Sequence, residues 1–209
     1  MTDELVFYTN PMSRGRVVRW MLEESGAPYR TEILEYGTMM KAPEYLTINP
    51  MGKVPAIRHG DIIVTECAAI CAYLADAYPD AGLAPPVNRR GSYYRWLFFA
   101  AGPLEAAVTN KSFGIELPAD KQGMVGYGNF ESVMNTLETS IPSKGYIAGD
   151  EFSAADVYLG SHVGWGMQFG SMEKRPVFEQ YWSRVSDRVA YRRANALDNA
   201  AISAGTDSG

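Results

Sequence analysis

A proline- and glycine-rich segment at residues 79–90 divides this sequence into two parts with different patterns. Before it, apolar runs alternate with turn signals and predict strand, helix, strand, helix, strand, strand and helix. After it, the apolar patterns have helical spacing, and a small, polar tail from residue 200 is expected to fray. The sequence therefore predicts an α/β domain over residues 1–78, a linker over 79–88 and an all-α domain over 89–209.

End signals place the expected helices and strands more closely. A buried strand at 5–8 ends at a turn, and the helix that starts after Ser13 ends at Gly26. Ser153 and Asp156 form a capping box at the start of another helix. The other expected elements are strands at 29–34, 54–58 and 62–64, and helices at 41–46, 65–78, 93–108 (bent near Gly102-Pro103), 122–139 and 177–188.

Composition and charge disfavour several classes of protein. With 19 Lys and Arg against 24 Asp and Glu, the net charge of −5 disfavours a nucleic-acid partner. The two cysteines and two histidines are too few for a disulfide framework or a typical zinc site, so no metal is expected. Apolar runs are too short for a signal peptide or a membrane span, so we expect a cytoplasmic protein without a membrane partner.

Two short segments suit the binding of a peptide-like ligand. Pro55 opens a strand, and a cis bond before it would turn the backbone of Val54 outward to pair with an extended peptide. An ordinary trans proline at a strand start is the alternative. Thr65, Glu66 and Cys67 open a helix, whose free N–H groups bind a carboxylate while Glu66 holds an amine. Alternatively, Thr65 is a plain N-cap and Glu66 only complements the helix dipole.

A third segment suits the ionisation of a thiol. Ser13 lies at a strand-to-helix turn, where a hydroxyl group can donate to an anion. Helix N-termini and cationic neighbours such as Arg14 and Arg16 lower a thiol pKa. Ser13 can cap the helix at the same time, and capping is compatible with catalysis.

The order of these segments resembles the cytosolic glutathione transferase family. The pattern is strand, helix, strand, then residues 49–55 (Asn-Pro-Met-Gly-Lys-Val-Pro), then residues 65–67 opening a helix, then a proline-bearing linker. An all-helical half follows, with Gly-Asp-Glu-Phe-Ser-Ala-Ala-Asp at 149–156. The resemblance covers nearly the whole chain. It implies a thioredoxin-like N-terminal domain and a helical C-terminal domain, closest to the bacterial and theta- or delta-like branches that use Ser or Cys after the first strand.

The resemblance also implies roles for individual residues. Val54 would pair with the cysteinyl part of glutathione, and Pro55 would be the family's cis-proline. Glu66 and the backbone of Cys67 would hold the γ-glutamyl end, although the family usually has serine at position 67. Lys53 would meet the glycyl carboxylate.

Ser13 falls at the family's thiol-activating position, with Asn10 and Tyr8 as alternatives. The implied function is a glutathione transferase of detoxification, acting as a homodimer that adds glutathione to a small hydrophobic electrophile. A glutathione-dependent peroxidase or disulfide reductase, and a non-catalytic binding protein, remain alternatives. The roles of Cys67 and Cys71 and the identity of the electrophile stay open. The expected walls of the second-substrate pocket, between the domains, are Met12, Leu104, Trp165, Met167 and Phe169.

Overall fold

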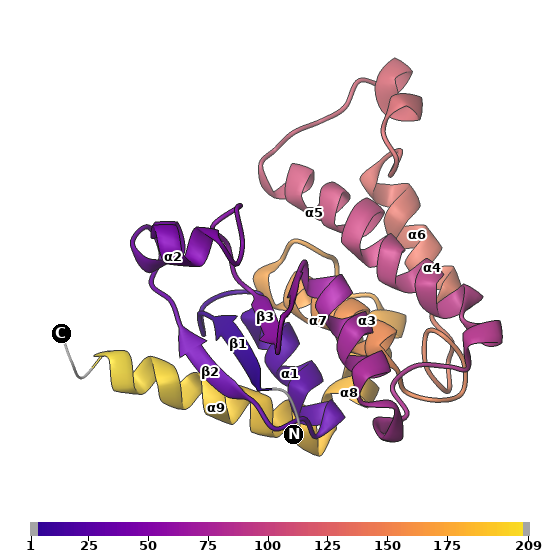
Figure 1. Ribbon diagram of the computed structural model, residues 1–209. Helices are drawn as coiled ribbons and strands as arrows, with labels where there is room; N and C mark the ends of the chain where they lie inside the picture. Colours follow the sequence, from indigo (N-terminus) through magenta and orange to yellow (C-terminus); the bar gives the residue numbers. More distant parts are fainter. Residues whose placement is uncertain (1–3, 207–209) are drawn as a thin grey trace. The chain divides into compact units, whose positions relative to one another are not determined.

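The computed structural model describes residues 4–206, and its chain forms two compact units (Figure 1). The first unit joins Met1–Leu83 to Arg188–Gly209, and the second is Ala84–Asp187. The expected boundaries placed residues 89–209 in one helical domain. In the structure, the segment from Arg188 onward groups with the first unit instead. It groups with the first unit because its last helix packs on the helix that follows the first strand.

The first unit is built on a four-stranded mixed sheet with the order β2-β1-β3-β4. Strands β1 and β2 are parallel, whereas β1–β3 and β3–β4 are antiparallel. Tyr8 of β1 is opposite Ala56 of β3, which is opposite Thr65 of β4. The end of β1, the start of β3 and the end of β4 therefore meet at one edge of the sheet. The strands are β1 Leu5–Thr9, β2 Arg30–Ile33, β3 Ala56–His59 and β4 Ile62–Thr65.

Helices complete this thioredoxin-like unit. Helix α1 packs against both α3 and α9, and it ends at Gly26, whose φ of 66° is left-handed as its C-terminal role requires. Trp20 and Leu22 of α1 are fully buried with Phe7 of β1. The helices are α1 Gly15–Ser25, α2 Pro43–Leu46, α3 Cys67–Ala77 and α9 Val189–Thr206, with short 3-10 turns at Met39–Lys41 and Pro79–Ala81.

Helix α9 corrects the prediction of a frayed tail from residue 200. The helix continues to Thr206 because its inner face is anchored on α1. Ala194 and Asp198 of that face are buried, and Asp198 pairs with the buried Arg19. Ala201 and Ala204 are also good helix formers once the helix is nucleated.

The second unit is helical. A π-helical turn at Ala100–Leu104, with Pro103 inside it, lies where the sequence predicted a bend. Proline removes one amide donor from the helix there. The helix expected over 122–139 begins only at Phe130, where Asn129 caps it by accepting from the amide of Ser132. The helices are α4 Gly91–Phe99, α5 Glu105–Ser112, α6 Phe130–Ser140, α7 Ala154–Phe169 and α8 Pro176–Ser186, with a π turn at Ala100–Leu104 and 3-10 turns at Val87–Arg89 and Ala119–Met124.

The capping box of α7 is the best-anchored helix start in this unit. Ser153 and Asp156 form the reciprocal cap, as expected. Asp156 also accepts from the amide of Ile147 at 2.9 Å and from the hydroxyl of Tyr181 at 2.8 Å, and it is fully buried. One carboxylate thus joins the loop before α7 to α8.

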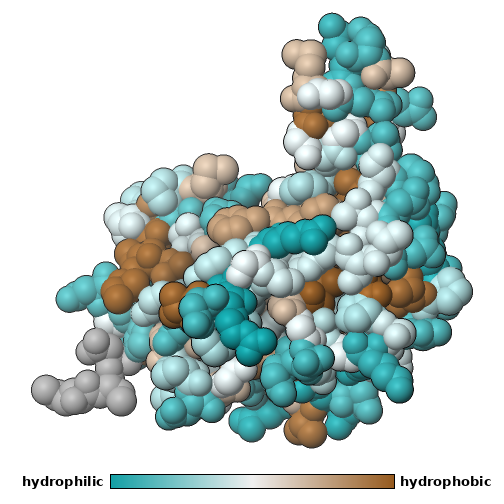
Figure 2. All heavy atoms as spheres, turned by 90° about the vertical axis from the view of Figure 1, so that its right-hand side faces the viewer, coloured by the Kyte–Doolittle hydropathy of each residue, from teal (hydrophilic) through white to brown (hydrophobic). Residues whose placement is uncertain are grey.

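The surface has a mixed character. On the face shown in Figure 2, hydrophobic residues lie in separate groups among hydrophilic ones. Among residues 4–206, none of the helices has the length and apolar content to cross a bilayer. Within the same part of the chain, His, Cys, Asp and Glu side chains form no group of three that could hold a metal ion.

Candidate functional site

The three segments singled out in the sequence meet at one edge of the sheet. The turn with Ser13 follows β1, Val54 and Pro55 precede β3, and Glu66 follows β4. The antiparallel registers bring these strand ends together. Cys67 closes the arrangement, because its thiol contacts the carbonyl oxygen of Arg14 at 3.7 Å.

Ser13 lies in a tight turn before α1. Its hydroxyl donates to the carbonyl of Asn10 at 2.6 Å and accepts from the amide of Gly15 at 2.9 Å. A Cβ at Gly15 would lie 1.9 Å from the hydroxyl oxygen of the buried Thr9, so the close approach of α1 to β1 requires glycine here. The hydroxyl of Ser13 has one proton, which must leave the Asn10 carbonyl before it can serve a ligand.

The two alternative thiol-contacting residues lie differently. The Asn10 side chain is engaged at both ends, since its amide donates to the Leu34 carbonyl and its oxygen accepts from the Met12 amide, both at 2.9 Å. Tyr8 is half-buried and packs its ring on Tyr45, with centroids 5.6 Å apart. The geometry therefore gives Asn10 the role of shaping the turn.

Val54 offers its backbone to a ligand. The Val54–Pro55 bond is cis, as the family resemblance implied. In the part of the chain that the structure describes, the amide and carbonyl of Val54 take no backbone hydrogen bond. The preceding carbonyl, of Lys53, is fixed by the Tyr45 hydroxyl at 2.6 Å and the Asn49 amide at 2.8 Å. Hydrogen bonds therefore fix the carbonyl of Lys53, while the backbone of Val54 is open to a ligand.

The start of α3 is a second open group of backbone donors. Glu66 precedes the helix with φ 65° and ψ 118°, a conformation that costs a non-glycine residue about 1–3 kcal/mol and marks functional sites. No side chain caps α3 within the described residues. The first N–H groups of the helix, beginning at Cys67, are therefore available to an anion beside the exposed Glu66 carboxylate.

Two lysines lie near the same segment. Lys53 is exposed, and Lys41 donates to the Met51 carbonyl at 3.0 Å. A Cβ on Gly52 would lie 2.9 Å from the ammonium group of Lys41, so this charge lies directly against the residue before Lys53. Lys41 was missed by sequence reasoning because it is distant in the chain from the 49–55 motif, and only the fold brings it there.

The second-substrate residues predicted from the sequence fall into two groups. Leu104 is fully buried and Met167 nearly so, which makes both core residues of the helical unit. Met12 is 71% exposed in the first unit, while Trp165 is half-buried and Phe169 is 74% exposed in the second. A hollow of about 510 Å³ within the helical unit, lined by residues of α5, α6 and the loop between them, contains none of the five.

Comparisons with known proteins find glutathione transferases. The family model described as "Glutathione S-transferase, N-terminal domain" matches residues 12–77, which hold all three converging segments. Glutathione S-transferase F10 of Arabidopsis thaliana is 29% identical over 196 residues, covering 84% of this chain and 88% of the plant protein. The chain is thus similar to glutathione transferases, by the family model over residues 12–77 and by its relatives over most of its length.

Solved structures give the same result. A glutathione transferase from Methylococcus capsulatus has a TM-score of 0.76 and 26% identity, covering 93% of this chain and 98% of that one. A glutathione transferase homologue from Sulfitobacter, solved with bound glutathione, has a TM-score of 0.73 and 24% identity over 93% of this chain and 98% of its own. The second likeness shows the fold alone. The enzyme class of the chain is that of a glutathione transferase.

Proposed function

We propose that this enzyme binds glutathione along the sheet edge in an extended conformation. The unpaired backbone of Val54 adds the cysteinyl residue as a short extra strand. The γ-glutamyl end carries a carboxylate and an amine, which suit the open N–H groups of α3 and the Glu66 carboxylate. The ammonium groups of Lys41 and Lys53 suit the glycyl carboxylate. The observation that carries the proposal is the open backbone of Val54 beside an uncapped, strained helix start.

The second part of the proposal concerns the thiol. With the cysteinyl residue bound at Val54, its sulfur would lie toward the turn between β1 and α1, which contains Ser13. The hydroxyl of Ser13 turns its proton from the Asn10 carbonyl to the sulfur, while the N-terminus of α1 favours the thiolate. The proposal is therefore a serine-type glutathione transferase.

The proposed reaction is nucleophilic attack by the glutathione thiolate. The sulfur lone pair forms a C–S bond with an electrophilic carbon of a small hydrophobic compound. In a substitution the leaving group departs with its bonding electron pair, and the thiol proton passes to solvent. The peroxidase, reductase and non-catalytic alternatives have no observation in their favour. Met12, Trp165 and Phe169 stay predicted contacts of the electrophile, and a cytoplasmic location also stays a prediction.

The test is the pKa of the bound thiol. Ser13→Ala should raise it and lower the conjugation rate by about tenfold, less than the usual cost of a lost oxyanion donor because the backbone donors remain. The affinity for glutathione should stay nearly unchanged. The measurement is thiolate absorbance against pH, with conjugation of a chloronitroarene as the rate assay.

Tyr8→Phe is the matched control, because it removes a hydroxyl from the same sheet edge. An unmoved thiol pKa in Ser13→Ala together with a raised one in Tyr8→Phe would transfer the role to Tyr8. A hydroperoxide assay on the same samples separates conjugation from peroxidase activity.

A further inference from the structure

One arginine of α1 binds the turn that contains Ser13. Arg16 donates through Nε to the carbonyl of Pro11, two residues before Ser13, at 2.7 Å. Pro11 is buried and has no N–H, so its carbonyl is the one backbone polar group through which this residue can bind Arg16. A guanidinium bond to a buried carbonyl is charge-assisted and short, which makes it directional.

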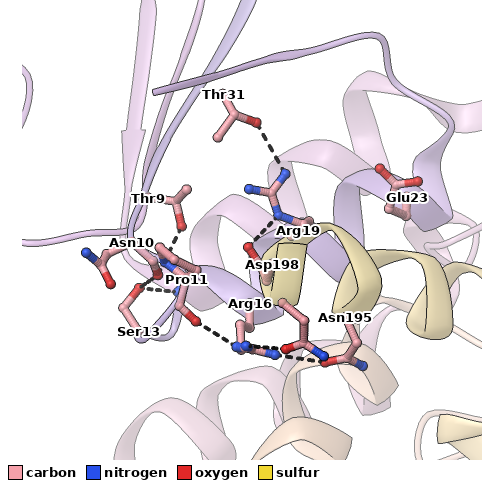
Figure 3. A network of polar contacts seen from close by, with 12 residues as sticks. Thr9, Asn10, Pro11, Ser13, Arg16, Arg19, Glu23, Thr31, Asn195 and Asp198 are labelled. Carbon is pink, nitrogen blue, oxygen red and sulfur yellow. Dashed lines mark hydrogen bonds and ion pairs between the residues drawn. The ribbon is translucent and has the colours of Figure 1, made fainter. Parts of the chain in front are cut away.

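The other two nitrogens of Arg16 reach a distant part of the chain. Nη1 donates to the side-chain oxygen of Asn195 at 3.2 Å, and Nη2 donates to that of Asn199 at 2.8 Å. Both asparagines belong to α9 and lie one helical turn apart, so they present neighbouring oxygens to the planar guanidinium. Figure 3 shows the chain of contacts from the turn through Arg16 to Asn195.

Within residues 4–206, the oxygens that accept from Arg16 are all uncharged. The guanidinium is therefore fixed by geometry while its positive charge remains near the start of α1. The same helix pair has a separate connection for stability, in which the buried Arg19 pairs with Asp198 at 2.7 Å. Arg16 connects α9 to the turn with Ser13, whereas the hydrogen bonds of Arg19 go to Asp198, Tyr29 and Thr31.

We propose that Arg16, held by Asn195 and Asn199, is a positioning residue for thiol activation, so that α9 takes part in setting the geometry of Ser13. The inference rests on the proposed function of Ser13. A displacement of about 1 Å in a reacting group can cost about 100-fold in rate, so a partly loosened turn should cost less than that. Arg16 acts through the turn and does not itself contact glutathione.

The first variant removes the two asparagine acceptors, Asn195→Ala with Asn199→Ala. We expect a higher pKa of the bound glutathione thiol and a kcat lower by about tenfold, with the dissociation constant of glutathione within about twofold of wild type. Arg16→Lys keeps the charge but loses the planar fork, and it should shift the thiol pKa in the same direction.

Arg193→Ala is the matched control. It also removes a contact between α9 and α1, because Arg193 pairs with Glu23 at 2.7 Å, but it leaves the turn untouched. Its thiol pKa and kcat should equal those of wild type. Asn199 is exposed, so the single variant Asn199→Ala keeps the test usable if the double variant fails to fold.

The outcomes separate this inference from the proposed function. If wild type lowers the thiol pKa and Ser13→Ala raises it, but the asparagine variants match wild type, α9 has no positioning role. Equal losses in the asparagine variants and in Arg193→Ala would also overturn the inference, since they would reflect only helix docking. If wild type bound glutathione without lowering the thiol pKa, the proposed activation and this inference would both be wrong.

Discussion

At the scale of single residues, Glu66 has a backbone conformation that favours glycine and a side chain that glycine lacks. Its φ of 65° would suit glycine, yet a carboxylate stands there beside the open start of α3. Unfavourable conformations of this kind persist when the surrounding structure enforces them, and they cluster at active and ligand-binding sites. Glycine would relax the backbone and lose the charge, whereas glutamine would lose the charge alone.

We expect Glu66→Gly to raise the free energy of unfolding by about 1 kcal/mol through relief of the strain. Both Glu66→Gly and Glu66→Gln should weaken glutathione binding by about ten- to a hundredfold, the value of one charge-assisted hydrogen bond. Denaturant unfolding and calorimetric titration measure the two effects. Equal stability of the glycine and glutamine variants would show that the backbone is not strained, and unchanged affinity would place the amine of glutathione elsewhere.

At the scale of elements, the start of α7 depends on one buried carboxylate. Asp156 accepts from Ile147, from Ser153 and from Tyr181. Asp156→Ala should lower the free energy of unfolding by about 3–4 kcal/mol, because it leaves several buried donors without a partner. Tyr181→Phe removes one of these bonds and should cost about 1–2 kcal/mol. Thermal and denaturant unfolding give both values, and a larger cost for Tyr181→Phe than for Asp156→Ala would contradict this account.

The same carboxylate gives a pH dependence. Burial raises the pKa of Asp156 above its ordinary value, although the hydrogen bonds from Ile147, Tyr181 and Ser153 oppose the shift. The folded state then binds the proton more tightly than the unfolded state. Its contribution to stability is full below the unfolded pKa of about 3.9 and is lost as pH rises through the folded pKa. The stability of wild type relative to Asp156→Asn should therefore fall as pH rises above about 4; a rise over that range would mean that the hydrogen bonds outweigh burial.

The docking of α9 depends on a buried ion pair. Asp198 is 1% exposed, and its loss would leave the charge of the buried Arg19 without its carboxylate. Asp198→Ala should cost about 3–5 kcal/mol of unfolding free energy. The ion pair of Arg193 with Glu23 is largely exposed on the arginine side, so Arg193→Ala should cost less than about 1 kcal/mol. Similar costs for the two variants would show that α9 is held by apolar packing instead.

These elements also show what the sequence could predict. The succession of strands and helices along residues 1–78, helix α1, the irregular turn at Pro103 and the capping box of α7 follow from local signals of apolar spacing, glycine, proline and caps. The full extent of helix α9 could not be predicted in this way. Its inner face is largely alanine and polar residues, and their partners on α1 are distant in sequence. The segments of the proposed glutathione site have recognisable motifs, whereas Lys41 enters only through contacts that the fold makes. Arg16 was expected as a cationic neighbour of the thiol, but its contacts with Pro11, Asn195 and Asn199 appear only in the fold.

At the scale of the whole molecule, we expect a homodimer with two-fold symmetry. The edge strand β4 exposes Ile62 by 53% and Ile63 by 43%, and an unpaired apolar edge favours association. Sedimentation at micromolar concentration should give twice the chain mass of 23.0 kDa. Ile63→Glu should shift the population toward monomer, while Phe113→Glu, a change at another exposed apolar residue, should not. A 23.0 kDa species in wild type would refute the dimer.

The grouping of α9 with the first unit has a consequence for the order in which the protein is made. The sheet, α1 and α3 leave the ribosome early, but residues 188–206 follow only after the whole helical unit has been synthesised. Until then Arg19 has no carboxylate and Arg16 has no asparagines to hold it. If α9 positions Arg16 as proposed, the glutathione site reaches its final geometry only after residues 195–199 have been made, and the nascent chain carries an unfinished site until then.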